Sequence, residues 1–78
     1  MSQSLKILKA LTDATRLRLV ALLSREELSV NELKEITELG QSRISTHLGV
    51  LQDNGLLKFR KDGKRSLYRI NPEANSQA

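Results

Sequence analysis

The sequence predicts a small, mainly α-helical domain that ends in a β-hairpin. Apolar residues recur at helical spacing in four segments between residues 3 and 54, each with a capping or turn signal beside it. Residues 56–70 then alternate between apolar and charged side chains around an Asp-Gly pair. Four helices followed by a two-stranded wing make up the winged helix-turn-helix architecture.

The first two helices are predicted at residues 3–11 and 14–23. Leu5, Leu8 and Leu11 recur at helical spacing in the first segment. Thr12 or Asp13 is a suitable N-cap for the second, whose apolar residues cover the broad arc typical of a central helix. The residues expected on that arc are Leu17, Val20, Leu22 and Leu23.

The third and fourth helices are the expected helix-turn-helix pair. Ser29 and Glu32 have the spacing of a capping box, which opens a helix over residues 30–38. Leu39 and Gly40 form the turn, and the fourth helix begins at about Gln41 and ends before a left-handed cap at Gly55. The inward residues are predicted to be Val30, Leu33 and Ile36 in the third helix and Ile44, Leu48 and Leu51 in the fourth.

Residues 57–70 are predicted to form the wing. Leu57 and Phe59 alternate with charged residues on the first strand, and Tyr68 and Ile70 continue the apolar face on the second. Asp62 and Gly63 are the predicted two-residue turn. Since Pro72 ends the return strand, we expect a winged-helix domain over residues 1–72 and a tail, or the start of a linker, over 73–78.

Length and composition limit the function. Seventy-eight residues allow one domain with a modest core. The chain has no cysteine, which excludes a disulfide scaffold and a thiolate metal site and fits a reducing compartment. It contains no apolar run of membrane-spanning length and no signal-type N-terminus, so we expect a cytoplasmic protein without a membrane partner.

Positive charge is concentrated in the second half of the chain. Residues 1–40 contain six basic and six acidic side chains, whereas residues 41–78 contain seven and three, so the whole net charge of +4 lies there. This asymmetry favours a polyanionic partner. Phe59 and Tyr68 are the only aromatic residues, which argues against a single-strand binder because such proteins need stacking platforms.

The helix at residues 41–54 indicates double-stranded DNA as that partner. Its outward face carries short hydroxyl side chains, an arginine and Gly49, so it can lie close to another surface. Short donors and acceptors reach base edges in the major groove, and a cationic hairpin contacts phosphates. We therefore expect this helix in the major groove and the wing on the backbone. The candidate DNA-binding residues are Gln41, Ser42, Arg43, Ser45, Thr46 and His47 in the helix and Lys58, Arg60, Lys61, Lys64 and Arg65 in the wing.

The sequence shows no recognisable catalytic or metal centre. Ser45 and His47 lie about 200° apart around one helix, so they cannot share a proton in a triad with Asp53. One histidine and no cysteine make a transition-metal site unexpected. The scattered glycines form no phosphate-cradling run. We expect neither enzymatic activity nor a cofactor.

Three motifs resemble those of the ArsR-type bacterial repressors. Residues 11–20 read LTDATRLRLV, similar to the family's L-x-D-x-T-R-L-x-I-L opening, and residues 44–51 read ISTHLGVL, similar to its V-S-x-H-L-x-x-L recognition helix. Residues 54–57, 63–65 and 68–70 are similar to its x-G-L-V … G-R … Y-R-L wing. The motifs occur in the right order and cover nearly the whole chain. The resemblance implies a homodimeric transcriptional regulator, and more specifically a repressor, that binds an inverted-repeat operator.

The sequence departs from this family pattern in two places. Metal-sensing members carry E-L-C-V-C-D-L in the third helix, where residues 27–33 read ELSVNEL, so Ser29 and Asn31 replace both thiolates. The C-terminal helix through which members dimerise would follow residue 78, which implies a longer protein and a dimer that is weak in isolation but forms on DNA. Two other functions fit the same pattern: a winged-helix protein docking module, and the N-terminal regulatory domain of a larger enzyme such as a methyltransferase.

Overall fold

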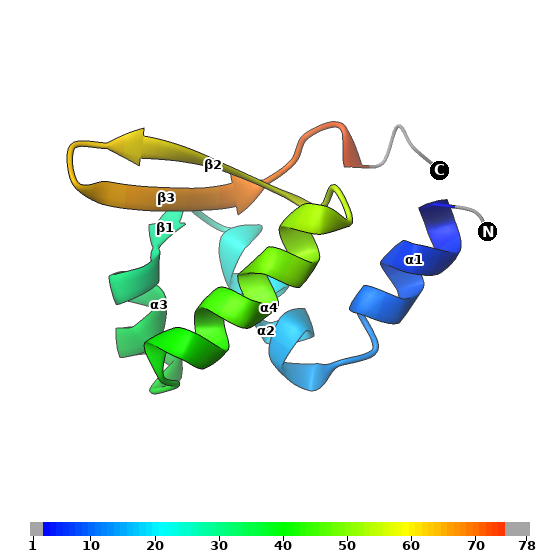
Figure 1. The fold of residues 1–78 in the computed structure, drawn as a ribbon, viewed down its shortest axis with the longest axis horizontal. Helices are drawn as coiled ribbons and strands as arrows, with labels where there is room; N and C mark the ends of the chain where they lie inside the picture. Colours follow the sequence, from blue (N-terminus) through cyan, green and yellow to red (C-terminus); the bar gives the residue numbers. More distant parts are fainter. Residues whose placement is uncertain (1–2, 75–78) are drawn as a thin grey trace.

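The computed structural model describes residues 3–74, which form four helices and a three-stranded antiparallel sheet (Figure 1). The helices are α1 (Gln3–Ala10), α2 (Ala14–Leu23), α3 (Val30–Thr37) and α4 (Gln41–Asp53). The strands are β1 (Leu28–Ser29), β2 (Leu57–Asp62) and β3 (Arg65–Ile70), in the order β1-β3-β2. The predicted winged helix-turn-helix is confirmed, with α3 and α4 as the helix-turn-helix and β2 and β3 as the wing.

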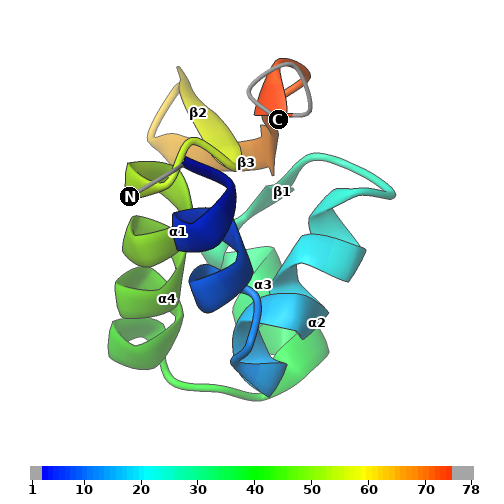
Figure 2. The same cartoon turned by 90° about the vertical axis from the view of Figure 1, so that its right-hand side faces the viewer.

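The core lies between the helices and the sheet, with α4 crossing beneath the wing (Figures 1 and 2). The predicted apolar stripe of α4 is confirmed, because its three residues are 0–1% exposed. Burying a side chain of this size stabilises the fold by about 1.5–3 kcal/mol, so this stripe fixes how α4 sits on the domain. The buried cluster consists of Ala10, Leu19, Leu23, Leu28, Leu33, Ile44, Leu48, Leu51, Leu56 and Leu57.

The predicted inward residues of α2 and α3 are only partly right. Leu17 is 49% exposed, whereas Leu19, which the sequence pattern does not select, is fully buried. Because α2 is apolar over most of its circumference, its sequence does not reveal which arc its neighbours cover. In α3, Ile36 is 45% exposed and Thr37 is buried instead. Burial of the Thr37 hydroxyl is compatible with its polarity because it donates a hydrogen bond to the Leu33 carbonyl at 2.7 Å.

The sheet has one strand more than predicted. In β1, Leu28 pairs with Tyr68 and Ser29 with Leu67 of β3. A strand of two residues has no periodicity that a sequence could display. The paired strand nevertheless ties the start of α3 to the wing.

The hairpin turn lies one residue later than predicted. Asp62 pairs with Arg65, so the two turn residues are Gly63 and Lys64 and Asp62 is the last residue of β2. Gly63 has a φ of +64°. A two-residue hairpin loop with glycine first at positive φ suits the twist of the flanking strands.

The ends of the helix-turn-helix are held by local hydrogen bonds. The predicted left-handed cap at Gly55, with a φ of +76°, is confirmed. There the Leu56 N–H donates to the Leu51 carbonyl at 3.0 Å and the Gly55 N–H to Gln52 at 2.9 Å, which is a Schellman motif. In the α3–α4 turn the left-handed residue is Glu38, with a φ of +60°.

The wing tip lies at one end of the molecule, and α1 lies at the other end together with the turn formed by residues 72–74 (Figure 1). Of the expected tail, residues 75–78 lie outside the described part of the chain. Among residues 3–74, no helix is long and apolar enough to cross a membrane.

Candidate nucleic-acid interface

The outward face of α4 is small, polar and free of acidic side chains as far as Gln52. Five of its predicted site residues are exposed, namely Gln41, Ser42, Arg43, Ser45 and Thr46. Gly40 is the N-cap and provides no side-chain hydrogen bond, so the first amide groups of α4 keep their partial positive charge. Beside Gly49, a Cβ atom would meet no heavy atom within 4 Å. This face can therefore approach a polyanion closely.

The Thr46 hydroxyl is already used as a donor. Its Oγ1 donates to the Ser42 carbonyl at 3.0 Å, the usual back-bond of a threonine within a helix. The oxygen keeps both lone pairs, and the side chain is exposed, so Thr46 can present an acceptor or an apolar methyl contact. Such a methyl is suited to the thymine methyl group in the major groove.

His47 is half-buried and contacts a residue that the site prediction does not include. Its Nδ1 lies 3.3 Å from Nη1 of Arg16, which is in the first turn of α2. Arg16 is held on its other side, where Nε donates to the Ala10 carbonyl at 2.6 Å. Arg16 therefore joins the C-terminal end of α1 to α4. Its only sequence signal is its place in the D-x-T-R segment.

Asp13 fixes the backbone of this connection. Its carboxylate caps α2 by accepting from the N–H groups of Thr15 at 2.8 Å and Arg16 at 3.1 Å. The Arg16 and Thr15 amides together hold the pKa of the Asp13 carboxyl below its usual value, although partial desolvation opposes them. The predicted N-cap at this helix start is thereby assigned to Asp13 rather than to Thr12.

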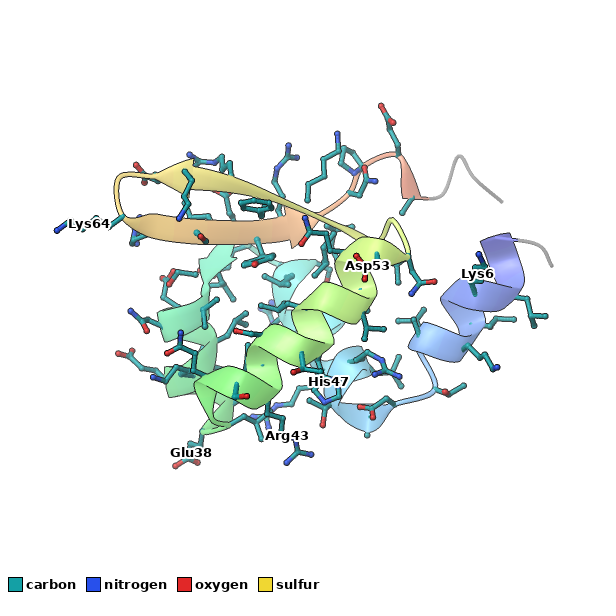
Figure 3. The ribbon with its side chains drawn as sticks, viewed as in Figure 1. Lys6, Glu38, Arg43, His47, Asp53 and Lys64 are labelled. Carbon is teal, nitrogen blue, oxygen red and sulfur yellow. The ribbon has the colours of Figure 1, made fainter. Side chains whose placement is uncertain are left out.

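The wing presents three exposed lysines, Lys58, Lys61 and Lys64. Lys64 points away from the body of the molecule at the turn (Figure 3). Arg65 is also exposed and lies 3.2 Å from the Asp62 carboxylate. An exposed ion pair of this kind is weak, so Arg65 can exchange Asp62 for another anion.

Arg60 is held in a different way from the lysines. Its Nε and Nη2 donate to the two carboxylate oxygens of Glu27 at 2.9 and 2.8 Å. The Arg60 guanidinium lowers the pKa of the Glu27 carboxyl, and Glu27 raises the pKa of Arg60. Arg60 pairs with Leu67 across the wing, and Leu67 is only 5% exposed. The ion pair thus spans β3 on the face that carries Leu67.

A cleft of about 310 Å³ lies between the start of α3 and the wing, lined by Ser29, Val30, Asn31, Gln41, Lys64, Arg65 and Ser66. It brings together the two positions at which metal-sensing members carry thiolates. Ser29 is buried and its hydroxyl accepts the Glu32 N–H at 3.1 Å, so the confirmed capping box already uses it. Neither Ser29 nor Asn31 offers an anionic ligand, and the residues present do not fit a soft metal ion. Within residues 3–74 no three His, Cys, Asp or Glu side chains come together as a metal site.

The sequence of residues 13–58 matches the family model described as bacterial regulatory protein, arsR family. This region is more than half of the chain. The chain belongs to the arsR family. The match includes α2, the helix-turn-helix and the start of the wing, and so covers the elements that form the exposed polar face and its Arg16 contact.

Two relatives extend this arsR assignment. The chain is 44% identical over 68 residues to the arsenic resistance transcriptional regulator ArsR1 of Pseudomonas putida, which covers 86% of this chain and 53% of that protein. It is 44% identical over 69 residues to the arsenical resistance operon repressor of Escherichia coli, which covers 87% of this chain and 59% of that protein. The arsR-family chain thus spans little more than half the length of these relatives.

A solved structure supports the same fold. The chain superimposes with a TM-score of 0.86, at 31% identity, on a homodimeric winged helix-turn-helix DNA-binding domain from Mycobacterium bovis. The alignment covers 95% of this arsR-family chain and 68% of that domain. The architecture of residues 3–74 is therefore that of a winged helix-turn-helix domain.

Proposed function

We propose that this chain is the DNA-binding module of a transcriptional regulator, with α4 in the major groove and the wing on the sugar-phosphate backbone. The observation that carries the proposal is the outward face of α4. It presents short polar side chains, Arg43 and uncapped amide groups, and its first turn contains no acidic residue. A helix with this surface can reach base edges without repelling the phosphates on either side.

Each part of the interface has its own role in this proposal. Gln41, Ser42, Ser45 and Thr46 contact base edges, and Arg43 and His47 contact a base or a flanking phosphate. Lys58, Lys61, Lys64 and Arg65 contact phosphates, which adds affinity for all sequences alike. Arg60 is a weaker candidate for such a contact, because its guanidinium already binds Glu27 in bidentate geometry.

The functional unit that we propose is a winged-helix domain over residues 1–72 that acts as a homodimer on an inverted repeat. Two copies on adjacent half-sites explain how a small surface reads a long operator. An operator that overlaps the promoter would be blocked by this binding, so we propose repression as the outcome, which is the activity named for the Escherichia coli relative. We further propose that the module is not an enzyme, and that it acts in the bacterial cytoplasm, where its DNA lies.

Selection of bound sequences from random duplex DNA tests the proposal. The full chain is incubated with the library at a fixed salt concentration of roughly 0.1 M, because affinity depends steeply on salt. We expect an enriched motif with two half-sites whose centres are about one helical turn, or a multiple of it, apart. The variant with both Ser42 and Thr46 replaced by alanine is the matched control and should enrich a degenerate motif. Failure of the unaltered chain to enrich any motif would refute the proposal.

A further inference from the structure

Arg16 reaches the recognition helix from a distant part of the chain. Its guanidinium lies between the Ala10 carbonyl, which accepts from Nε at 2.6 Å, and the His47 ring, 3.3 Å from Nη1. Guanidinium is a donor only and stays protonated in proteins. Since Arg16 can only donate, Nδ1 of His47 must be the acceptor. In the neutral ring the proton then resides on Nε2.

The second ring nitrogen of His47 is available for a ligand. The N–H direction at Nε2 diverges widely from the lone pair at Nδ1, so Nε2–H points away from Arg16. Among residues 3–74, Nε2 makes no hydrogen bond. His47 follows Arg43 by four residues, which places the two side chains on the same flank of α4 (Figure 3). This flank therefore offers a cation and a neutral N–H donor side by side.

We propose that Arg16 is a positioning residue for DNA binding: it holds the His47 imidazole in one tautomer and one orientation, so that Nε2–H donates to a DNA phosphate beside Arg43. This inference rests on the proposed function. Arg16 itself does not contact the DNA. Its effect is to order the His47 ring before binding, which otherwise costs about 0.5–1.5 kcal/mol for an immobilised side chain. Loss of this ordering corresponds to roughly three- to tenfold weaker binding.

NMR of the free, full chain tests the first half of the proposal. His47 is the only histidine in the sequence, so its two ring nitrogens can be observed without ambiguity. At a pH where the ring is neutral, we expect Nδ1 to have the ¹⁵N shift of an unprotonated nitrogen. Arg16→Met should move this shift towards a mixture of the two tautomers. Arg18→Met is the matched control, because Arg18 carries the same charge on α2 but bonds to the Ile36 carbonyl instead. A protonated Nδ1 in the unaltered chain, or equal spectra for the two variants, would overturn the proposal.

DNA affinity on one selected duplex tests the second half. Arg16→Met should weaken binding roughly three- to tenfold beyond the loss seen with Arg18→Met, which reports the effect of charge alone. In the His47→Ala background the two variants should have equal effects, because the side-chain acceptor for Arg16 is gone. Arg16→Lys keeps the charge and one donor and should recover part of the loss, with thermal unfolding confirming that each variant folds.

The outcomes separate this inference from the proposed function. If the unaltered chain binds no duplex, the proposed function fails and the role of Arg16 in binding fails with it. If the chain binds but Arg16→Met and Arg18→Met weaken it equally, only the inference fails. If Arg16→Met weakens DNA binding by the same factor with and without His47, the inference is also overturned, because Arg16 then acts independently of His47.

Discussion

Replacing Lys64 by alanine should weaken DNA binding in a salt-dependent way without changing sequence preference. Lys64 is exposed in the wing turn and points away from the body of the molecule (Figure 3). Each lost phosphate contact lowers the slope of log affinity against log salt by about 0.9. The same relation gives a loss of about eightfold at 0.1 M salt and almost none at 1 M. Fluorescence anisotropy with one selected duplex, repeated at several salt concentrations, measures both quantities.

Arg60→Ala is the matched comparison, because it removes the same charge from the same hairpin. Arg60 is already paired with Glu27, so its loss should change the salt slope by much less. The variant should instead unfold at a lower denaturant concentration. Without Arg60, the ion pair with Glu27 no longer spans the face of β3 that carries Leu67. Glu27→Gln, which releases Arg60, should strengthen DNA binding. Equal salt slopes for the Lys64 and Arg60 variants would refute the distinction between free and paired wing cations.

The other predictions concern specificity, metal response, stability and assembly. Ser42→Ala should relax preference at particular base pairs by roughly 1–3 kcal/mol with an unchanged salt slope, as repeated selection will show. Zinc, cadmium or arsenite should leave DNA affinity unchanged, because Ser29 and Asn31 offer no thiolate; a stoichiometric effect reversed by chelator would contradict this. Glu38→Gly should raise the free energy of unfolding by about 0.5 kcal/mol in urea titrations, because relief of left-handed strain exceeds the entropy that glycine adds to the unfolded chain. Glu35→Gly, inside α3, is the control and should lower the free energy of unfolding by about 1 kcal/mol. The isolated chain should sediment as a monomer or weak dimer and pair on operator DNA, because the first helical segment has few large apolar residues from which to build a stable interface. A tight dimer at nanomolar concentration would contradict this prediction.

Local signals predict most of this fold because they act over a few residues. The Ser29 capping box and the Gly55 cap each appear in the sequence at fixed offsets, and both occur in the structure with the expected hydrogen bonds. The stripe of α4 is equally readable, because polar residues separate its apolar ones. In α2 that contrast is missing, so the pattern selects Leu17 instead of Leu19. The left-handed residue at Glu38 is also hidden, because residues with side chains seldom adopt that conformation.

The same distinction between local signals and long-range contacts applies to the candidate site. The exposed residues of α4 follow from the position of its buried stripe, so the sequence places them correctly on the surface. What periodicity cannot show is a contact between distant segments. Arg16 and His47 are 31 residues apart and meet only because α2 packs against α4. The tautomer of His47, and with it the donor on the recognition helix, depends on that packing.

The sequence analysis misses strand β1 and overestimates Arg60 as a phosphate-binding cation, and both errors have the same cause. From the sequence, Arg60 is one of several equivalent charges in a basic hairpin. Its partner Glu27 lies 33 residues earlier and immediately precedes β1. Only the pairing of β1 with β3 carries Glu27 across the sheet to Arg60, and β1 is too short to be predicted. The wing therefore has fewer free cations than its composition indicates. The salt slope for DNA binding should accordingly reflect the exposed lysines and Arg65, with little contribution from Arg60.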